Sequence, residues 1–353
     1  DYRITNINEM LFGKKISQTN IRYMTARHNW TSNTIYNEYS HLSTDLFTNV
    51  TPFYVKNSTN NVYKCLYNNY GTPSTFEPSL VQNTVFTTAD GYVWKYMYTI
   101  SSQDMNDYAT DAYMPVTPNS AITTSASKNI EVIKVTNPGY NYTTVANGIV
   151  GSVSNTLVFQ IGSDASGDNN YYVNNAFYIY DGPAAGQLRQ ITNYVVNTSG
   201  KWVYVNTDIS SVVAGLSKYK IAPNVIIYGD GTGATAICNV SNGYNIQSIT
   251  VVNTGINYSF ANVTISGNPN YGSNATAIAY IPPPGGHGSN TYVELGVDSF
   301  AGKIQFANNE SNTILTHTSF RTVGLLKNPG IAANDSIHYT SNTFSQVYGC
   351  VFY

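Results

Sequence analysis

The sequence predicts a mostly β protein, and its composition gives three reasons for this prediction. Tyr occurs 31 times in 353 residues, and aromatic and β-branched residues favour pleated strands. Asn, Ser, Thr and Gly supply much of the remaining chain, and these residues favour turns over long helices. Asp, Glu, Lys and Arg make up only 10% of the residues, against roughly 25% in an average soluble domain. We therefore expect short strands, tight turns and a surface of amides and hydroxyls.

Such a surface has two explanations that are compatible with each other. Burying an amide costs less than burying an ion, so a charge-poor surface suits a subunit that lies against many neighbours. The codon usage of an AT-rich genome, which favours Asn, Tyr and Ile, gives the same composition. Composition alone therefore leaves the role of this surface open.

Charge and cysteine content exclude several classes of protein. Lys plus Arg number 17 and Asp plus Glu number 19, so no basic field exists for nucleic acid. Cys65, Cys238 and Cys350 are odd in number and far apart, which indicates neither a disulfide framework nor a zinc site. The chain has no 18-residue apolar run and no apolar signal region after Asp1, so neither a membrane span nor secretion is expected.

The first third of the chain is expected to contain short elements. A helical turn or two is expected in residues 7–15, and strands in residues 21–27 and 62–67. Asp90-Gly91 is a strong turn signal before a strand in residues 92–100. Ser102 is expected to cap a short helix that ends at Asp107 or Tyr108. Residues 120–128 are small and polar, and they are expected to be a linker.

The strand in residues 92–100 should carry aromatic residues on one face, because alternate residues of a strand point to opposite sides. The expected faces are Tyr92, Trp94, Tyr96 and Tyr98 on one side, and Val93, Lys95, Met97 and Thr99 on the other. A face of four aromatic rings is either core or an interface with a partner.

An internal repeat follows the linker. Residues 130–142 align with residues 246–258 at an offset of 116 (246 minus 130), and the identities include Asn137 with Asn253 and Gly139 with Gly255. In both copies a strand runs into a turn that needs Gly, and a Tyr then returns toward the sheet. We expect two related β units, 130–151 and 246–267, with hairpins around residues 176–180, 187–194 and 202–205 between them.

The segment 282–288, Pro-Pro-Pro-Gly-Gly-His-Gly, breaks regular structure and marks the expected exit from the inserted region. After it, a turn or strand is expected in residues 292–297, and strands in residues 303–306, 320–326 and 347–353. The expected organisation is an N-terminal core (1–128), an inserted β region with the repeat (129–282), and a C-terminal segment that returns to the core (283–353).

Motifs of catalysis and ligand binding are weak, so we expect no enzyme, cofactor or metal. Residues 229–236 lack the Gly-Lys-Ser/Thr ending of a phosphate loop and predict a hairpin turn; a calcium loop is disfavoured because only Asp230 supplies a carboxylate. Glu77 and Asp90 could form a carboxylate pair for glycoside hydrolysis, but their spacing cannot show that they meet. The five histidines, at positions 28, 41, 287, 317 and 338, show no metal-binding spacing. His287 is expected either to bind a ligand from its Gly-rich loop or to bond a neighbouring turn.

The segments 62–66, 89–100 and 320–329 together resemble the homodimeric wedge protein in the baseplate of contractile-tailed, T-even-like bacteriophages. The segment 285–289, the G-x-G-A-x-A pattern and the V-x-N-x-G-x-N-Y pattern look like versions found in marine and cyanobacterial phages. The residues that carry the resemblance, as core or as interface, are Cys65, Asp90, Gly91, Tyr92, Trp94, Tyr96, His287, Gly288, Phe320, Arg321, Asn328 and Pro329.

The resemblance implies a subunit of several β-sandwich-like parts with a few short helices and an architectural role. It implies a homodimer that contacts other wedge proteins in the virion tail baseplate after synthesis in the host cytoplasm, with no catalytic residues and no small-molecule substrate. The central region departs from the family, because a repeated β unit replaces a more charged segment. The partner-facing residues therefore cannot be carried over.

A receptor- or glycan-binding module of a tail fibre or adhesin is the alternative hypothesis, because Tyr- and Asn-rich β surfaces stack on sugars and bond to them. It predicts exposed rings among Tyr171, Tyr172, Tyr178 and Trp202. A depolymerase comes third, and it requires two carboxylates that face each other across a cleft.

Overall fold

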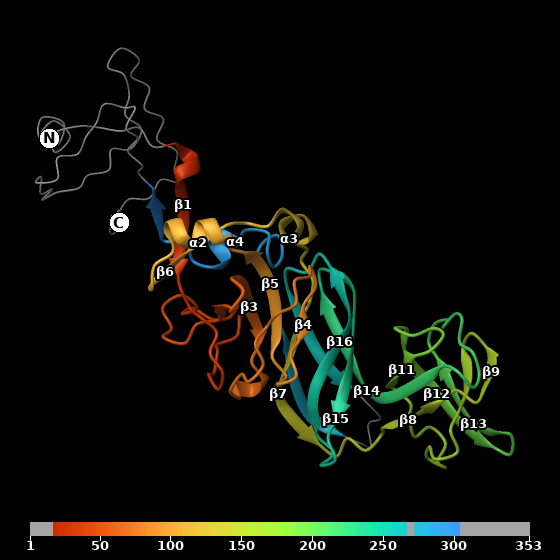
Figure 1. Ribbon diagram of the computed structural model, residues 1–353. Coiled ribbons are helices and arrows are strands. Elements are labelled where there is room, and N and C mark those ends of the chain that lie inside the picture. Colours follow the sequence, from red (N-terminus) through yellow and green to blue (C-terminus); the bar gives the residue numbers. More distant parts are fainter. Residues whose placement is uncertain (1–16, 267–271, 304–353) are drawn as a thin grey trace, which may run out of the picture.

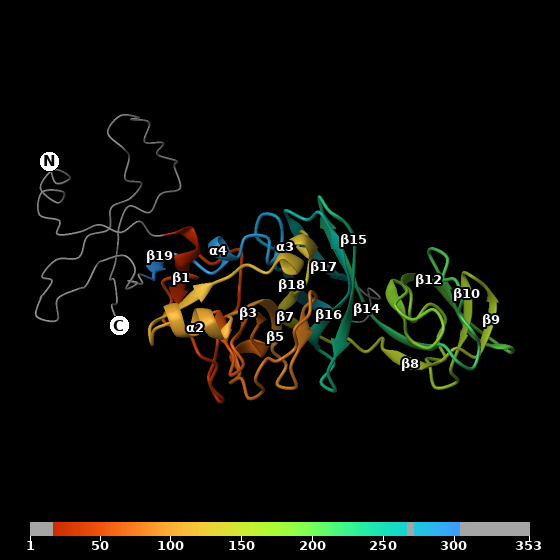
Figure 2. The ribbon, with the colours of Figure 1, turned by 45° about the horizontal axis from the view of Figure 1, so that its top comes forward.

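The structure is a computed structural model, and it describes residues 17–266 and 272–303 (Figure 1). The described chain is mostly β, as predicted, with antiparallel strands in three sheets and a few short helices. Figures 1 and 2 show three parts in a row. We call them the N-terminal body (residues 17–128 and 282–303), the barrel (129–145, 223–266 and 272–281) and the outer unit (146–222).

The N-terminal body contains two sheets, whose strand orders are β2-β3-β5-β4 and β19-β1-β6. The strands of the first are β2 (Tyr54–Lys56), β3 (Asn61–Tyr67), β4 (Phe86–Thr87) and β5 (Val93–Thr99). Those of the second are β1 (Ile21–Ala26), β6 (Tyr113–Val116) and β19 (Ser299–Gly302). Ile21 of β1 pairs with Gly302 of β19, so the first and the last described strands lie side by side.

The strands predicted in residues 62–67 and 92–100 are confirmed as β3 and β5. Gly91 has a φ of +84° in the turn before β5, which a residue with a side chain rarely adopts. The expected alternation was wrong at Tyr98, which packs in the same core cluster as Met97. The register of β3 against β5 shifts between Val62 and Tyr63, and this bulge breaks the alternation.

Three short helices differ in detail from what the sequence predicts. Helix α2 (Ser102–Tyr108) exists, but Ser101 rather than Ser102 is its N-cap. The expected linker 120–128 begins with helix α3 (Ser120–Ser125), because the Asn119 side chain accepts hydrogen bonds from the first turn. The turn or strand expected in residues 292–297 is instead helix α4 (Thr291–Glu294) followed by a turn. Two 3-10 turns, η1 (Gln18–Asn20) and η2 (Asn69–Gly71), complete the body.

The barrel has six strands in the order β7-β18-β17-β14-β15-β16. They are β7 (Ile133–Tyr140), β14 (Lys218–Gly229), β15 (Thr232–Val240), β16 (Ile246–Ile256), β17 (Ala261–Ser266) and β18 (Ser273–Ala279). Backbone hydrogen bonds join the flanks of β7 and β16: Ile130 N to Thr254 O, Tyr142 N to Tyr244 O and Tyr258 N to Lys128 O. These bonds close the sheet into a flattened barrel around one core.

The outer unit is inserted between β7 and β14, where the predicted hairpins are confirmed. Its strands are β8 (Ala146–Ile149), β9 (Ser152–Asn155), β10 (Val158–Ile161), β11 (Asn175–Asp181), β12 (Leu188–Asn197) and β13 (Gly200–Val205). Stacked rings of Phe159, Phe177 and Tyr219 lie in its separate core. Strand β14 links the two parts, because its first half pairs with β8 and β11 and its second half pairs with β17.

The repeated sequence forms the same local structure twice. In each copy an Asn side chain accepts a hydrogen bond from the Gly two residues later: Asn137 from Gly139 N at 3.0 Å, and Asn253 from Gly255 N at 2.9 Å. The two glycines have φ values of +60° and +61°. The repeat therefore specifies a turn that only Gly adopts without strain.

The tyrosine after each turn fastens it to the neighbouring strand. The Tyr142 hydroxyl accepts a hydrogen bond from Ala275 N, and the Tyr258 hydroxyl accepts one from Ala234 N. We call each Asn-x-Gly-x-Asn-Tyr turn with its tyrosine contact a clasp.

The strands that receive the clasps are also related in sequence. Residues 231–236 (Gly-Thr-Gly-Ala-Thr-Ala) match residues 272–277 (Gly-Ser-Asn-Ala-Thr-Ala) at an offset of 41 (272 minus 231). In these matching positions Gly233 and Asn274 both have positive φ. Each clasp strand thus pairs with a related strand, β7 with β18 and β16 with β15, and antiparallel pairing of β14 with β17 joins the two units.

The chain leaves the barrel through residues 282–290 and crosses back over the N-terminal body. A Cβ on Gly286 would lie 2.1 Å from Ser127 O, and one on Gly288 would lie 2.4 Å from the Ile122 side chain. These glycines let the segment lie directly on helix α3 and the residues after it. The elements expected in residues 7–15, 320–326 and 347–353 lie outside the described residues, and so does the strand expected in residues 303–306 except for Lys303.

The clasp predicts a large effect of Gly255→Ala on the free energy of unfolding. The new Cβ would lie 2.6 Å from Ala234 N and from Thr232 O, in a backbone with positive φ. We expect a loss of about 3 kcal/mol, measured by urea unfolding, from backbone strain and overpacking together. The control is Gly186→Ala, which has a positive φ but open space around it, and should lose about 1 kcal/mol. Equal losses in the two variants would contradict the clasp.

Candidate functional site

The predicted motif residues of β3 and β5 lie in the interior of the N-terminal body. Cys65 and Trp94 are cross-strand partners, and the Tyr92 ring stacks on Trp94 with centroids 5.5 Å apart. Tyr36 meets Trp94 edge-on at 5.9 Å. These residues and Tyr96 are all buried in one cluster. Here the aromatic rings form a core and not an exposed face.

Asp90 fastens the loop before the turn at Gly91. Its carboxylate accepts hydrogen bonds from Thr75 N at 2.7 Å, Phe76 N at 3.0 Å, the Ser74 hydroxyl at 3.0 Å and the Thr88 hydroxyl at 2.5 Å. Burial acts to raise the pKa of Asp90, but these hydrogen bonds outweigh it and hold the pKa below its usual value of 3.8. Asp90 therefore acts as a structural anion in this loop.

Glu77 and Asp90, the carboxylates considered for hydrolysis, fasten different loops. Glu77 accepts hydrogen bonds from Ser58 N at 2.7 Å and from the Ser58 hydroxyl at 2.9 Å. Each carboxylate is therefore occupied by donors of the chain itself.

Two lysines are buried side by side in the same sheet. Lys64 of β3 and Lys95 of β5 are cross-strand partners, with residue exposures of 0% and 4%. Two ammonium groups in such positions repel each other, and each loses its hydration. The carboxylates that neutralise them come from outside the sheet: Glu294 lies 2.5 Å from Lys64 Nζ, and Glu131 lies 3.3 Å from Lys95 Nζ.

His287 lies between the two carboxylates. Its Nδ1 is 3.9 Å from Glu294 Oε2, and its Nε2 is 4.0 Å from Glu131 Oε2. The Tyr39 ring covers the group, with its centroid 4.8 Å from the His287 ring and 4.5 Å from Lys64 Nζ. We call Lys64, Lys95, Glu131, His287 and Glu294 the buried charge cluster.

Burial shifts the proton affinities within this cluster. It lowers the pKa of Lys64 and of His287, and it raises the pKa of Glu131, because each charged form has lost its water. Glu294 opposes the shift at Lys64 through its negative charge and its hydrogen bond.

The segment through which the chain leaves the barrel, residues 282–290, is called the return segment, and it binds the second carboxylate oxygen of Glu294. Glu294 Oε1 accepts hydrogen bonds from Gly288 N at 2.7 Å and from Asn290 N at 3.3 Å. His287 and Gly288, both predicted from sequence, thus belong to a site that joins β3, β5, the start of the barrel and the return segment. His287 lies near buried carboxylates and does not face an open ligand site.

A second polar contact links the body to the barrel. Glu38 accepts hydrogen bonds from Lys134 Nζ at 2.5 Å, from the Tyr280 hydroxyl at 2.6 Å and from Asn68 N at 3.1 Å. Glu38 is largely buried, Lys134 lies in the barrel strand β7, and Tyr280 directly follows the barrel strand β18. The barrel is therefore attached to the body by specific charged contacts.

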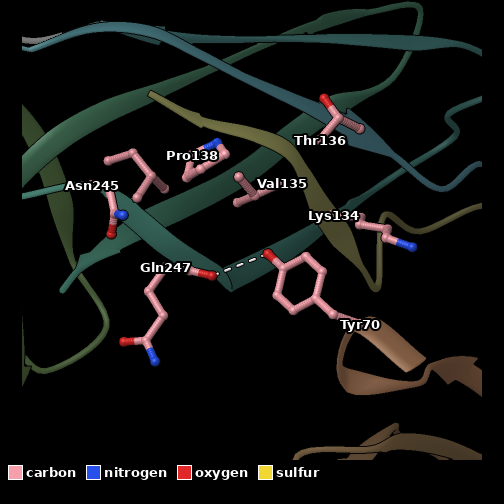
Figure 3. A pocket seen from close by; sticks show the side chains of 8 residues that line it. Tyr70, Lys134, Val135, Thr136, Pro138, Asn245 and Gln247 are labelled. Carbon is pink, nitrogen blue, oxygen red and sulfur yellow. Dashed lines mark hydrogen bonds between the residues drawn. The ribbon is translucent and has the colours of Figure 1, made fainter. Parts of the chain in front are cut away.

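A pocket of about 630 Å³ lies beside this contact, between the body and the barrel. Tyr70, in η2 with a φ of +59°, reaches across it and donates a hydrogen bond to Gln247 O at 3.0 Å (Figure 3). The other lining residues are Lys134, Val135, Thr136, Pro138, Asn245 and Ile246. The hydrogen bond of Tyr70 thus joins the body to the barrel across this pocket.

The aromatic residues of the glycan hypothesis do not form one exposed surface. Tyr172 is buried against the Tyr194 ring at 4.9 Å, whereas Tyr171, Tyr178 and Trp202 are partly buried. Tyr171 and Tyr178 pack against different cores.

The glycine-rich segment 229–236 forms the predicted hairpin turn between β14 and β15. Its Asp230 accepts hydrogen bonds from the hydroxyl and N–H of Ser259 and from Phe260 N, which lower its pKa to about 2. Within residues 17–266 and 272–303, no group of three or more His, Cys, Asp or Glu residues is placed to hold a metal ion. No described helix is long and apolar enough to cross a membrane.

Comparisons of this chain with protein-family models, with curated proteins and with solved structures found no match. Four of the residues that carry the phage resemblance, Phe320, Arg321, Asn328 and Pro329, lie outside the described residues.

Sequence reasoning missed most of the buried charge cluster. It placed Lys95 on the face opposite Trp94 but assigned that face no partner, whereas both faces of β5 are covered. The available signal was a lysine at the centre of each of two apolar strands. Glu131 and Glu294 could not be assigned as partners, because they lie far from these strands in sequence.

Asp90 predicts a specific pH dependence of stability. Its folded pKa is below the usual 3.8, so its contribution is present above that pH and is lost as pH falls through the folded pKa. We expect Asp90→Asn to lower the free energy of unfolding by about 2 kcal/mol at pH 7, as for hydrogen bonds to a charged group. The difference from the wild type should shrink below pH 3.8 in urea titrations. A difference that is constant from pH 7 to acid would contradict this role.

Proposed function

We propose that this chain is a structural subunit of a contractile phage tail baseplate, of the wedge type, and that it acts through protein–protein interfaces and not as an enzyme. It forms a homodimer and contacts other wedge proteins in the virion. The residue pattern around β3 and β5 supports this proposal, because four of the positions that resemble the wedge family, Cys65, Tyr92, Trp94 and Tyr96, lie together in one core cluster of the N-terminal body.

The observation that carries the proposal is a set of exposed apolar side chains on two loops of the N-terminal body. One loop joins β1 to β2 (residues 27–53), and the other joins η2 to β4 (residues 72–85). Seven large apolar residues there are more than one third exposed: Ile35, Leu42, Phe47, Val50, Phe76, Leu80 and Val81. Exposed apolar residues occur in all three parts of the chain, but seven of them on two loops of a charge-poor chain fit a surface that a partner covers.

The buried charge cluster supports the same role. Its carboxylates have their partners within the chain, and it fixes the return segment and the barrel on the body. A subunit that transmits force during tail contraction needs its parts held in fixed relative positions. The barrel and the outer unit then extend from a body that docks on its neighbours.

The dimer is tested by light scattering of the purified full chain. We expect a dimer at micromolar concentration, with a buried interface above about 1,000 Å² in total. Val50→Asp combined with Val81→Asp should give a folded monomer, because Val50 is 97% and Val81 60% exposed. Leu216→Asp in the outer unit, also 60% exposed, is the matched control and should remain dimeric. A wild-type monomer at all micromolar concentrations would overturn the proposal.

A further inference from the structure

Lys64 and Glu294 bring an amine and a carboxyl group into contact in the absence of water. Lys64 Nζ lies 2.5 Å from Glu294 Oε2, and the two side chains are 0% and 2% exposed. The residues are 230 positions apart in sequence. Holding two reacting groups together in this way removes much of the entropy cost that a reaction between free groups must overcome.

The carboxyl group of Glu294 is also polarised on its other oxygen. Gly288 N and Asn290 N both donate to Glu294 Oε1, at 2.7 Å and 3.3 Å. Two backbone N–H groups on one oxygen are the arrangement that stabilises the oxyanion of an acyl-transfer intermediate. This oxygen is distinct from the one that contacts the amine.

His287 and Glu131 supply a route for protons. His287 Nδ1 lies 3.9 Å from Glu294 Oε2, and Nε2 lies 4.0 Å from Glu131 Oε2. Both His287 Nδ1 and Glu131 Oε2 are buried without a hydrogen-bond partner. Small side-chain movements would bring each pair to hydrogen-bond distance, which is the arrangement of a histidine that carries a proton beside an orienting carboxylate.

We propose that Lys64 and Glu294 condense to an intramolecular amide bond, which makes this site a self-modification site. A proton passes from the Lys64 ammonium to Glu294 Oε2, and the neutral amine attacks Cδ. The negative charge that develops on Oε1 is held by Gly288 N and Asn290 N. The C–N bond forms, the C–Oε2 bond breaks, and Oε2 leaves as water with a second proton from Nζ carried by His287. Ammonium plus carboxylate give amide plus water, and no oxidant or reductant is needed.

The electrostatics of the site support this chemistry. Burial lowers the pKa of Lys64 and so favours the amine that attacks, and it lowers the pKa of His287 and so favours the imidazole that accepts a proton. Exclusion of water also favours the amide over its hydrolysis. The bond would close a loop between β3 and helix α4 and reduce the conformational freedom of the unfolded chain, as a disulfide does.

Intact-mass measurement of the denatured full chain tests the proposal directly. The wild type should be lighter than its sequence by one water molecule, and Lys64→Met should have the full mass of its sequence. Cyanogen bromide cleaves after methionine, which places Lys64 in fragment 25–97 and Glu294 in fragment 115–353. In the wild type these two fragments should stay joined under denaturing and reducing conditions.

Controls keep this test independent of variant folding. Lys134 and Glu38 are also 2.5 Å apart, but Lys134 is 27% exposed, so this pair should be unmodified. A tryptic digest tests this, because it should release peptide 28–56, which contains Glu38, and peptide 129–134, which ends at Lys134, at the masses of their sequences. His287→Gln should slow amide formation after refolding, followed by mass against time. A wild-type chain of unmodified mass, with separable fragments 25–97 and 115–353, would overturn the proposal whether or not the variants fold.

Discussion

The fold of the N-terminal body depends on one electrostatic constraint, the burial of two lysines as cross-strand neighbours. Lys64 and Lys95 cannot be buried in a four-stranded sheet alone, because the desolvation of each ammonium costs several kcal/mol and the two repel. Glu131 at the entrance to the barrel and Glu294 after the return supply the compensating charges. The sheet is therefore stable only when Glu131, before the barrel strands, and Glu294, after them, are both in place against it.

This constraint explains how an insertion can be large without loosening the body. The barrel and the outer unit have their own cores, and Val132 and Tyr280 at the edge of the barrel pack into the core of the body. The buried charge cluster holds the two ends of the body together from one side, and pairing of β1 with β19 does so from the other. Within the barrel the two clasps play a similar role, because each fixes a strand to its neighbour through a glycine turn and a buried tyrosine.

The sequence predicted the parts of this structure that depend on local pattern. The strands β3 and β5, the turn at Gly91 and both copies of the clasp follow from residue types at short spacing. Predictions failed where a distant contact decides the outcome. Tyr98 changed sides because the register of β3 against β5 shifts at a bulge, and Lys95 is buried because Asn83 O and the distant Glu131 contact its ammonium group. Glu131 and Glu294 carry no local signal of their partners.

Amide hydrogen exchange of the full-length Glu131→Gln variant tests the central claim most directly. Removing one partner of a buried ion pair costs about 3–5 kcal/mol, so β3 and β5 should exchange at least about a hundredfold faster, while β12 and β13 of the outer unit stay unchanged. Asp181→Asn, which removes the exposed partner of Lys218, should leave all of these strands as protected as in the wild type. Unchanged protection of β3 and β5 in Glu131→Gln would contradict the account.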